Sequence, residues 1–199
     1  MRPSYSISLQ PIVEPITLAD ATEHLRVDSE DDIGYISSLI AVAREYVDSV
    51  TGRVSAVSSW LVLASTWDSL TSNCHSREIP LLRTPLLEVS SVKYYAPSSS
   101  TLTEITSGNL IVVKGTAPGI VKIVTALPAV DDRPDAIQIQ FLAGYRADEV
   151  VPPGHRHAIK MLVAHLYEQR QPVAFASCQN IPYALDALIS NQKVGGWIG

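Results

Sequence analysis

The sequence predicts an α+β fold, in which a helical body formed by N-terminal and C-terminal helices carries a central antiparallel β insertion. Apolar residues recur at helical spacing near both ends, whereas the segments between them are short, β-branched and bounded by Pro, Gly, Asn or Ser. Of the 199 residues, 46% are hydrophobic and 18% charged, so the chain can bury a core. The expected parts are an N-terminal helical part at 1–53, the β insertion at 54–147, C-terminal helices completing the helical body at 148–192, and a flexible tail at 193–199.

The segment TLADATEHLRV carries the signals of a helix start. Thr17 is a residue type that caps helices, and Asp20 follows at the capping-box position. Apolar residues then recur at helical spacing, so the sequence predicts a short helix over about 18–25.

The next helix has clear signals at both ends. Ser29 is the expected N-cap, acidic residues fill the first turn, and Gly52 is the expected stop. Its apolar stripe is widened to about half of the circumference by Tyr35, Leu39, Val42 and Tyr46. A face this wide fits two interpretations: a helix sunk in its own core, or a helix that also packs on a neighbouring subunit.

The pattern changes to that of strands in the middle of the chain. The expected strands lie in SSWLVLAS, LLEVSSVKYYA, NLIVVKG, GIVKIVTAL and DAIQIQFLAGY. Alternation places Lys122 on one face of its strand, and Gln138 with Gln140 on one face of another, so at least part of this sheet has a face in water.

Prolines and a stretch rich in Ser and Thr mark the borders of other elements. Pro80 and Pro85 predict an edge or crossing segment, because proline cannot donate to a central ladder. The stretch 96–109 is expected to form a hairpin tip. Helix returns after Pro152 and Pro153, and a last short helix is expected over about 182–190.

Charge and cysteine content limit the classes of function. The formal net charge of -5 argues against a freestanding binder of phosphate backbones. Cys74 and Cys178 lie far apart, and no signal-peptide pattern precedes them, so a reducing cytosolic origin fits best. The apolar runs are much shorter than the roughly 20 residues that cross a bilayer, so no membrane contact is expected.

The patterns for catalysis and metal binding are incomplete. His165 and Glu168 lie three residues apart on a predicted helix, which leaves a metal-assisted or acid/base enzyme as an alternative. A zincin needs a second histidine where Met161 stands, and His165 lies at the edge of an apolar arc, where a structural hydrogen bond is the competing role. Cys74 beside His75 lacks the further ligands of a zinc site. The sequence therefore predicts no cofactor and no metal.

A ligand-binding module is the other alternative. Tyr94 and Tyr95 are neighbours in a predicted strand, so their side chains point to opposite faces and at most one belongs to the core. The other could present a ligand face on the β insertion.

Several segments together resemble one known family. They are LADATEHLRVD, YISSLIAVAREYVDSVTGR, IPLLRTPLLEVSSVKYY, IQFLAGY, VPPGHRHAIKMLVAHLYEQRQPV and IPYALDALI. In order and spacing they are similar to the head-tail connector, or adaptor, proteins of long-tailed bacteriophages, in the longer form with a β insertion. The resemblance covers roughly residues 17–190.

The resemblance implies a structural virion protein without catalytic activity, made in the host cytoplasm and placed in the neck between capsid and tail. Such adaptors form a ring of roughly a dozen subunits beneath the portal protein. The ring extends the DNA channel and offers a platform for stopper or tail-completion proteins, and DNA passes through the lumen without specific binding.

The residues suited to such contacts form a candidate interface. The broad apolar stripe suits side-by-side packing in a ring. The tail KVGGWIG holds two large apolar groups between glycines and suits an anchor that orders on the portal, although an end that packs nowhere is the alternative. Arg170 lies within an apolar arc of its predicted helix, so its stem is expected to be buried and its guanidinium needs a partner. The candidate subunit or portal interface is Tyr35, Leu39, Val42, Tyr46, Arg170, Trp197 and Ile198.

Overall fold

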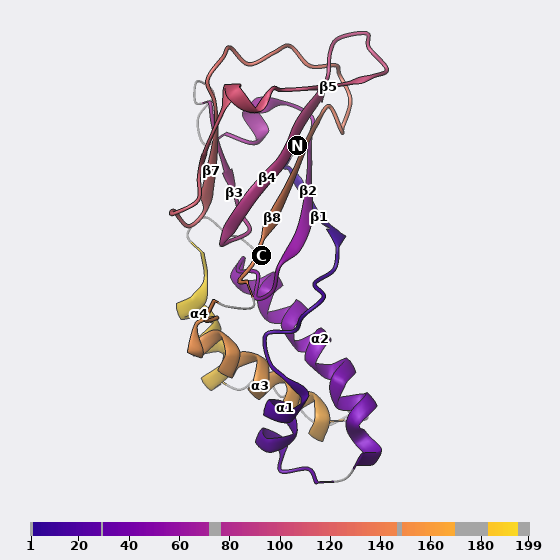
Figure 1. The fold of residues 1–199 in the computed structure, drawn as a ribbon, viewed down its shortest axis with the longest axis vertical. Helices are drawn as coiled ribbons and strands as arrows, with labels where there is room; N and C mark the ends of the chain where they lie inside the picture. Colours follow the sequence, from indigo (N-terminus) through magenta and orange to yellow (C-terminus); the bar gives the residue numbers. More distant parts are fainter. Residues whose placement is uncertain (1, 29, 72–76, 147–148, 170–182, 195–199) are drawn as a thin grey trace. The chain divides into compact units, whose positions relative to one another are not determined.

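The computed structural model describes residues 2–28, 30–71, 77–146, 149–169 and 183–194 (Figure 1). The chain forms two compact units. The β unit contains residues 1–12 and 57–144, and the helical unit contains residues 13–56 and 145–199. Helices and antiparallel sheets occur together, which confirms the predicted α+β class.

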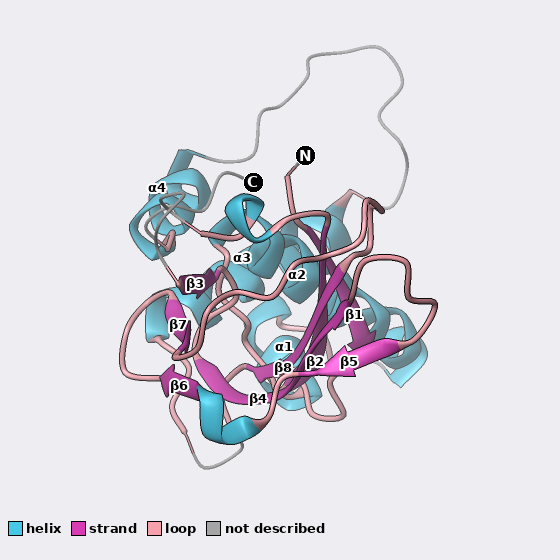
Figure 2. Ribbon diagram, turned by 90° about the horizontal axis from the view of Figure 1, so that it is seen from above, coloured by secondary structure: helices cyan, strands magenta, loops and turns pink. Residues whose placement is uncertain are grey.

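Two antiparallel sheets make up the β unit (Figures 1 and 2). One has the strand order β1-β2-β8-β4-β5, and the other has the order β3-β7-β6. The strands are β1 Ser4–Leu9, β2 Ser58–Ala64, β3 Glu78–Leu81, β4 Leu86–Tyr95, β5 Leu102–Glu104, β6 Leu110–Val113, β7 Gly119–Ile123 and β8 Ile137–Ala143. Each strand expected from its β-branched content is present.

Strand β8 is the middle of the larger sheet, between β2 and β4. Its Phe141 lies opposite Trp60 of β2 and Val89 of β4 in the ladder. Phe141 is fully buried, whereas Gln140, its neighbour in sequence, is exposed. The predicted alternation of a buried face and a solvent-exposed face is therefore confirmed along this strand.

Strand β1 lies where the sequence indicated only an extended start to the helical part. Residues 4–9 pair antiparallel with β2, with Tyr5 opposite Val62 and Ile7 opposite Trp60. The segment SYSISL alternates small polar and apolar side chains, which is the period of a half-buried strand. The first residues of the chain therefore belong to the β unit and not to the helical body.

Prolines and a glycine shape the smaller sheet and its surroundings. Pro80 lies in β3, which is an edge strand, as expected. At Gly119, an added Cβ would stand 2.5 Å from Cβ of Leu86, so only glycine lets β7 approach β4 this closely. The expected hairpin tip at 96–109 is shorter than predicted, because β5 and a 3-10 turn at Ser107–Asn109 occupy part of it.

Four described helices form the helical unit: α1 Leu18–Leu25, α2 Ile33–Thr51, α3 Pro153–Glu168 and α4 Tyr183–Gln192. The predicted capping box at α1 is confirmed, since the backbone N–H of Asp20 donates to Thr17 Oγ1 at 3.0 Å and the backbone N–H of Thr17 donates to Asp20 Oδ2 at 3.1 Å. Gly52 ends α2 at a φ of 73°, in the left-handed region, as predicted.

The start of α2 differs from the prediction. A short 3-10 helix, Glu30–Asp32, precedes it, and Asp32 is the N-cap, without a side-chain capping bond. Ser29, the expected cap, lies outside the described residues. The acidic residues expected in the first turn of the helix therefore form a separate turn before it.

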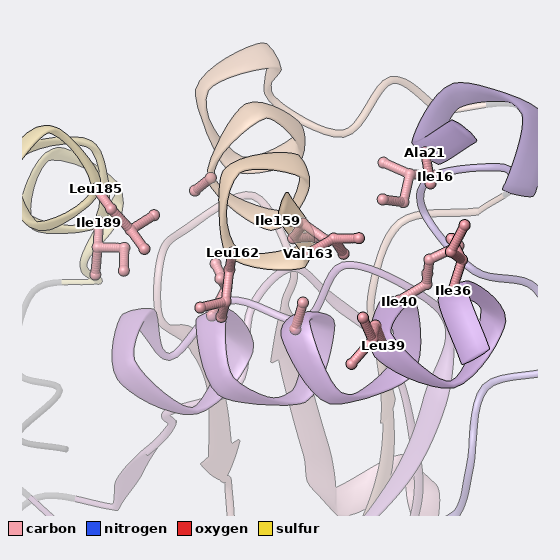
Figure 3. Close-up of a cluster of buried hydrophobic side chains, with 13 residues drawn as sticks. Ile16, Ala21, Ile36, Leu39, Ile40, Ile159, Leu162, Val163, Leu185 and Ile189 are labelled. Atoms are coloured by element: carbon pink, nitrogen blue, oxygen red, sulfur yellow. The ribbon is translucent and has the colours of Figure 1, made fainter. Parts of the chain in front are cut away.

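The core of the helical unit lies between α2 and α3, with contributions from α1 and α4 (Figure 3). One stripe of α2 faces α3, so apolar side chains three and four residues apart meet their counterparts. The buried cluster is Ile16, Ala21, Ile36, Leu39, Ile40, Ala43, Val47, Ala158, Ile159, Leu162, Val163, Leu185 and Ile189.

Candidate subunit interface

An apolar stripe remains exposed on α2 after the core has formed. Tyr35, Val42 and Tyr46 keep 36%, 53% and 37% of their surfaces exposed. At 100° per residue these three positions fall within about 40° of one another on the helix wheel. We call Tyr35, Val42 and Tyr46 the α2 stripe. Leu39, which the sequence grouped with them, is only 8% exposed and packs in the core cluster.

Two serines beside the α2 stripe bond to the backbone of their own helix. Ser38 Oγ donates to the carbonyl of Tyr35 at 2.7 Å, and Ser49 Oγ donates to the carbonyl of Tyr46 at 2.7 Å. Such bonds to the preceding turn satisfy hydroxyls within the helix itself. These two hydroxyls are therefore already bonded within α2, and the exposed Glu45 lies further round the helix on the same side.

Tyr35 is positioned by the neighbouring helix. Its ring lies 6.2 Å from the ring of Tyr167 on α3, centroid to centroid, at an interplanar angle of 39°. The hydroxyl of Tyr167 in turn donates to Asp32 Oδ2 at 2.5 Å. Aromatic contacts of this kind favour one orientation of each ring. One end of the α2 stripe is thus held in one orientation by α3.

An ion pair between a buried arginine and a partly exposed glutamate anchors the other side of α2. Arg44 Nε donates to Glu14 Oε2 at 2.8 Å, and the Arg44 side chain is only 8% exposed. Without Glu14 the buried guanidinium of Arg44 would lose its counter-charge, so the pair favours one rotation of α2 about its axis. The α2 stripe consequently faces outward in a fixed direction within the helical unit.

Asp20 links the start of α1 to α3. Besides capping α1, it accepts from Lys160 Nζ at 3.1 Å and from Arg156 Nη2 at 3.4 Å. The bonds from Thr17, and then the one from Lys160, lower the pKa of the Asp20 carboxyl to about 2. Asp20 therefore stays ionised and holds two cationic side chains of α3.

A buried polar cluster, Asp48, Ser55 and His155, was not anticipated from the sequence. His155 is fully buried, and its Nε2 lies 3.0 Å from Asp48 Oδ1 and 2.8 Å from Ser55 Oγ. The Ser55 hydroxyl also bonds Asp48 Oδ1, and the Ser55 backbone N–H donates to Asp48 Oδ2 at 3.0 Å. A carboxylate only accepts, so Nε2 carries the ring proton. His155 Nδ1 has no hydrogen-bond partner among the described residues.

The same three residue types form the nucleophilic triad of many hydrolases, but the geometry here differs. In a triad the carboxylate holds one ring nitrogen and the serine meets the other. Here Asp48 and Ser55 share Nε2, and none of the cluster faces solvent. The cluster joins the end of α2 to the start of α3. No local motif could reveal it, because Ser55 and His155 are 100 residues apart.

His165 and Glu168 were the residues considered for catalysis, and Tyr94 and Tyr95 those considered for ligand binding. His165 is half-buried on α3 and Glu168 is exposed. In the part of the chain that the structure describes, no group of three or more His, Cys, Asp or Glu side chains could hold a metal ion. Tyr94 and Tyr95 are both half-buried, and the guanidinium of Arg133 lies 3.7 Å from the centroid of the Tyr95 ring. These observations favour neither the enzyme nor the ligand-binding alternative.

Several predicted positions lie outside the described residues. They are Arg170, Trp197, Ile198, Cys74, His75 and Cys178. Among the helices that are described, none is long and apolar enough to span a membrane. Of the predicted interface, the structure therefore places only the four α2 residues, and it leaves three of them exposed.

No protein-family model matches the chain, and no curated protein matches it. Solved structures do match over nearly the whole length. The chain is similar to a chain in the neck of an empty gene transfer agent particle computed with C6 symmetry, at 16% identity and a TM-score of 0.76, covering 98% of both chains. It is also similar to a chain in the virion of a native gene transfer agent particle, at 17% identity, a TM-score of 0.70 and 97% and 98% coverage. A chain in the neck of the native particle, computed with C12 symmetry, matches at 17% identity, a TM-score of 0.66 and the same coverage. The chain thus has the fold of proteins found in the neck of such particles.

Proposed function

We propose that this chain is a structural protein of a phage-like virion neck, a head-tail connector. It assembles as a ring of roughly a dozen subunits beneath the portal protein, extends the DNA channel and offers a platform for a stopper or tail-completion protein. It acts by contact and not by catalysis.

The single observation that carries this proposal is the match along the whole chain to neck proteins of particles with cyclic symmetry. The match covers 98% of both chains, so the helical unit and the β unit are both represented. A shared fold does not by itself give a shared function. The proposal therefore also needs a surface for assembly, and the α2 stripe supplies a candidate.

The α2 stripe suits a heterologous contact between neighbouring subunits. Two tyrosines with a valine between them give apolar area with little loss of side-chain freedom, and aromatic residues are enriched at interface centres. Because α3 and the Arg44 pair fix its direction, the stripe presents the same surface on every copy. Repeating one such contact around an axis closes a ring.

The charge of the chain suits the passage of DNA. A net charge of -5 on each copy multiplies around a ring, and like charge repels the phosphate backbone. DNA would then slide through the lumen without sticking to the wall.

Native mass spectrometry tests the proposal. The full chain is measured alone and after mixing with the portal protein of the same particle. We expect a complex containing several copies of this chain in at least the second sample. A chain that remains monomeric in both samples would contradict the proposal, whereas a ring that forms only on the portal would support it.

A further inference from the structure

We infer a second contact between copies of this chain, in which the edge strand β6 of one copy pairs with the edge strand β1 of the next. The inference rests on the proposed ring and names a surface within it that differs from the α2 stripe. It starts from the edges of the two sheets of the β unit, which end in β1, β5, β3 and β6.

Two of these edges are protected against pairing. Strand β3 contains Pro80, and its Glu78 forms an ion pair with Lys122 at 3.0 Å. Strand β5 has only three residues, and its Glu104 pairs with Lys93 at 3.6 Å. Charges, prolines and short length are the usual means by which proteins keep strand edges from pairing with other chains.

The other two edges lack such charges and prolines, and β6, with four residues, is also short. Strand β6 has the sequence LIVV, with Ile111 51% exposed and Val113 40% exposed. Strand β1 has the sequence SYSISL and is six residues long. Neither contains a charged residue or a proline, and within the described residues no strand pairs with the outer edge of either one. An uncharged edge that no strand covers is a site for strand addition.

The positions of these edges select a second copy as the occupant. In both views the three-stranded sheet and β1 lie on opposite sides of the β unit (Figures 1 and 2). A contact between β6 and β1 is therefore heterologous, and each copy keeps one free edge for the next. Such a contact propagates from copy to copy, as a ring requires. Pairing β6 with β6 would instead stop at a dimer.

The contact would also add interactions at both edges. Each strand would gain ladder hydrogen bonds, and Ile111 and Val113 would gain cross-strand neighbours. Because β6 has four residues, the shared ladder is short. It therefore acts together with the α2 stripe and does not replace it.

Disulfide trapping tests the pairing. In the full chain carrying Cys74→Ser and Cys178→Ser, Ile111→Cys is combined with Ser4→Cys, Ser6→Cys or Ser8→Cys, so that three registers are sampled. Each variant is oxidised alone and with the portal protein, and products are separated on a non-reducing gel. We expect at least one combination to give a ladder beyond the dimer. Leu102→Cys on the protected strand β5 replaces Ile111→Cys in the matched control and should give at least tenfold less product.

The outcomes separate this inference from the proposed function. Assembly seen by native mass spectrometry, with no cross-linking above the Leu102→Cys control in any register, would overturn the β6–β1 contact and leave the ring intact. Dimers from Ile111→Cys without a β1 cysteine would also overturn it, in favour of β6–β6 pairing. If the chain assembles neither alone nor with the portal protein, the β6–β1 contact and the proposed ring are both contradicted. As a second readout, Ile111→Lys should weaken assembly at least tenfold, and Leu102→Lys should not.

Discussion

At the scale of single residues, Asp20 has two roles that depend on its ionisation. It caps α1, and it binds Lys160 and Arg156 of α3. Because its pKa is lowered from 3.8 to about 2 in the folded chain, its contribution to stability is complete above about pH 4 and is lost as the pH falls toward 2. The side chain is 27% exposed, so screening limits this contribution to about 1 kcal/mol.

Asp20→Asn should therefore lower the free energy of unfolding by about 1 kcal/mol at pH 7 and have little effect near pH 2. Urea unfolding of both proteins at pH 7, 4 and 2.5 measures the difference. Glu23→Gln, an exposed residue of the same helix, is the control. A difference between wild type and Asp20→Asn that persists unchanged at pH 2.5 would show that ionisation is not the cause.

His155 gives a second prediction at this scale. His155→Ala removes a fully buried partner of Asp48 and Ser55 and leaves a cavity beside a carboxylate with one donor fewer. We expect a loss of about 2–4 kcal/mol in the free energy of unfolding. His157→Ala, an exposed position on the same helix, should change it by less than about 0.5 kcal/mol. Equal effects of the two variants in urea titrations would show that the buried cluster is not important for stability.

The role of a polar residue such as Asp20 or His155 could be predicted from the sequence only where its partner is near in sequence. Thr17 and Asp20 are three residues apart, so the capping box could be recognised from local pattern. For His155, in the segment HRH, the sequence shows only that His157 is two residues away. Its role depends on Asp48, 107 residues away, and the folded chain alone brings them together.

At the scale of elements, periodicity predicted α2 and β8 well and β1 poorly. The stripes of α2 and β8 contain large apolar residues at a clear period. Strand β1 alternates serine with apolar residues, but only over six positions between Pro3 and Pro11, and its place is fixed by pairing with β2 across about 55 residues. Leu39 was grouped with the α2 stripe because a helix wheel gives direction but does not show how far a neighbouring helix covers each side chain.

The α2 stripe gives the prediction at this scale. Val42→Glu should strongly reduce assembly of the full chain on the portal, because it places a charge at the centre of an apolar contact. The free energy of unfolding should change by no more than about 0.5 kcal/mol, since Val42 is 53% exposed.

Ser37→Glu is the control for Val42→Glu. Ser37 is an exposed residue of α2 on the side away from the stripe. Native mass spectrometry and thermal unfolding of both variants separate assembly from stability. Normal assembly by Val42→Glu would exclude the α2 stripe as a subunit contact.

At the scale of the whole molecule, the negative charge predicts weak contact with DNA. With a net charge of -5, the full chain should not retain duplex DNA at physiological salt, even at about 100 µM protein. A gel mobility shift assay, repeated at low and high salt, measures this. Retention that weakens steeply with salt would instead indicate a basic surface that contacts phosphates.

The arrangement of the two units along the chain affects the order in which they can be completed during synthesis. The ribosome releases β1 and α2 early, yet β8, the middle strand of the larger sheet, comes only at residues 137–143, and α3 follows at 153–168. Until then β2 and β4 lack the strand that joins them, and α2 lacks the helix that covers its core stripe. A nascent chain interrupted before residue 137 therefore has neither unit complete, and its apolar surfaces are open to chaperones and proteases. Synthesis through α4 is therefore needed before both units have all of their described elements.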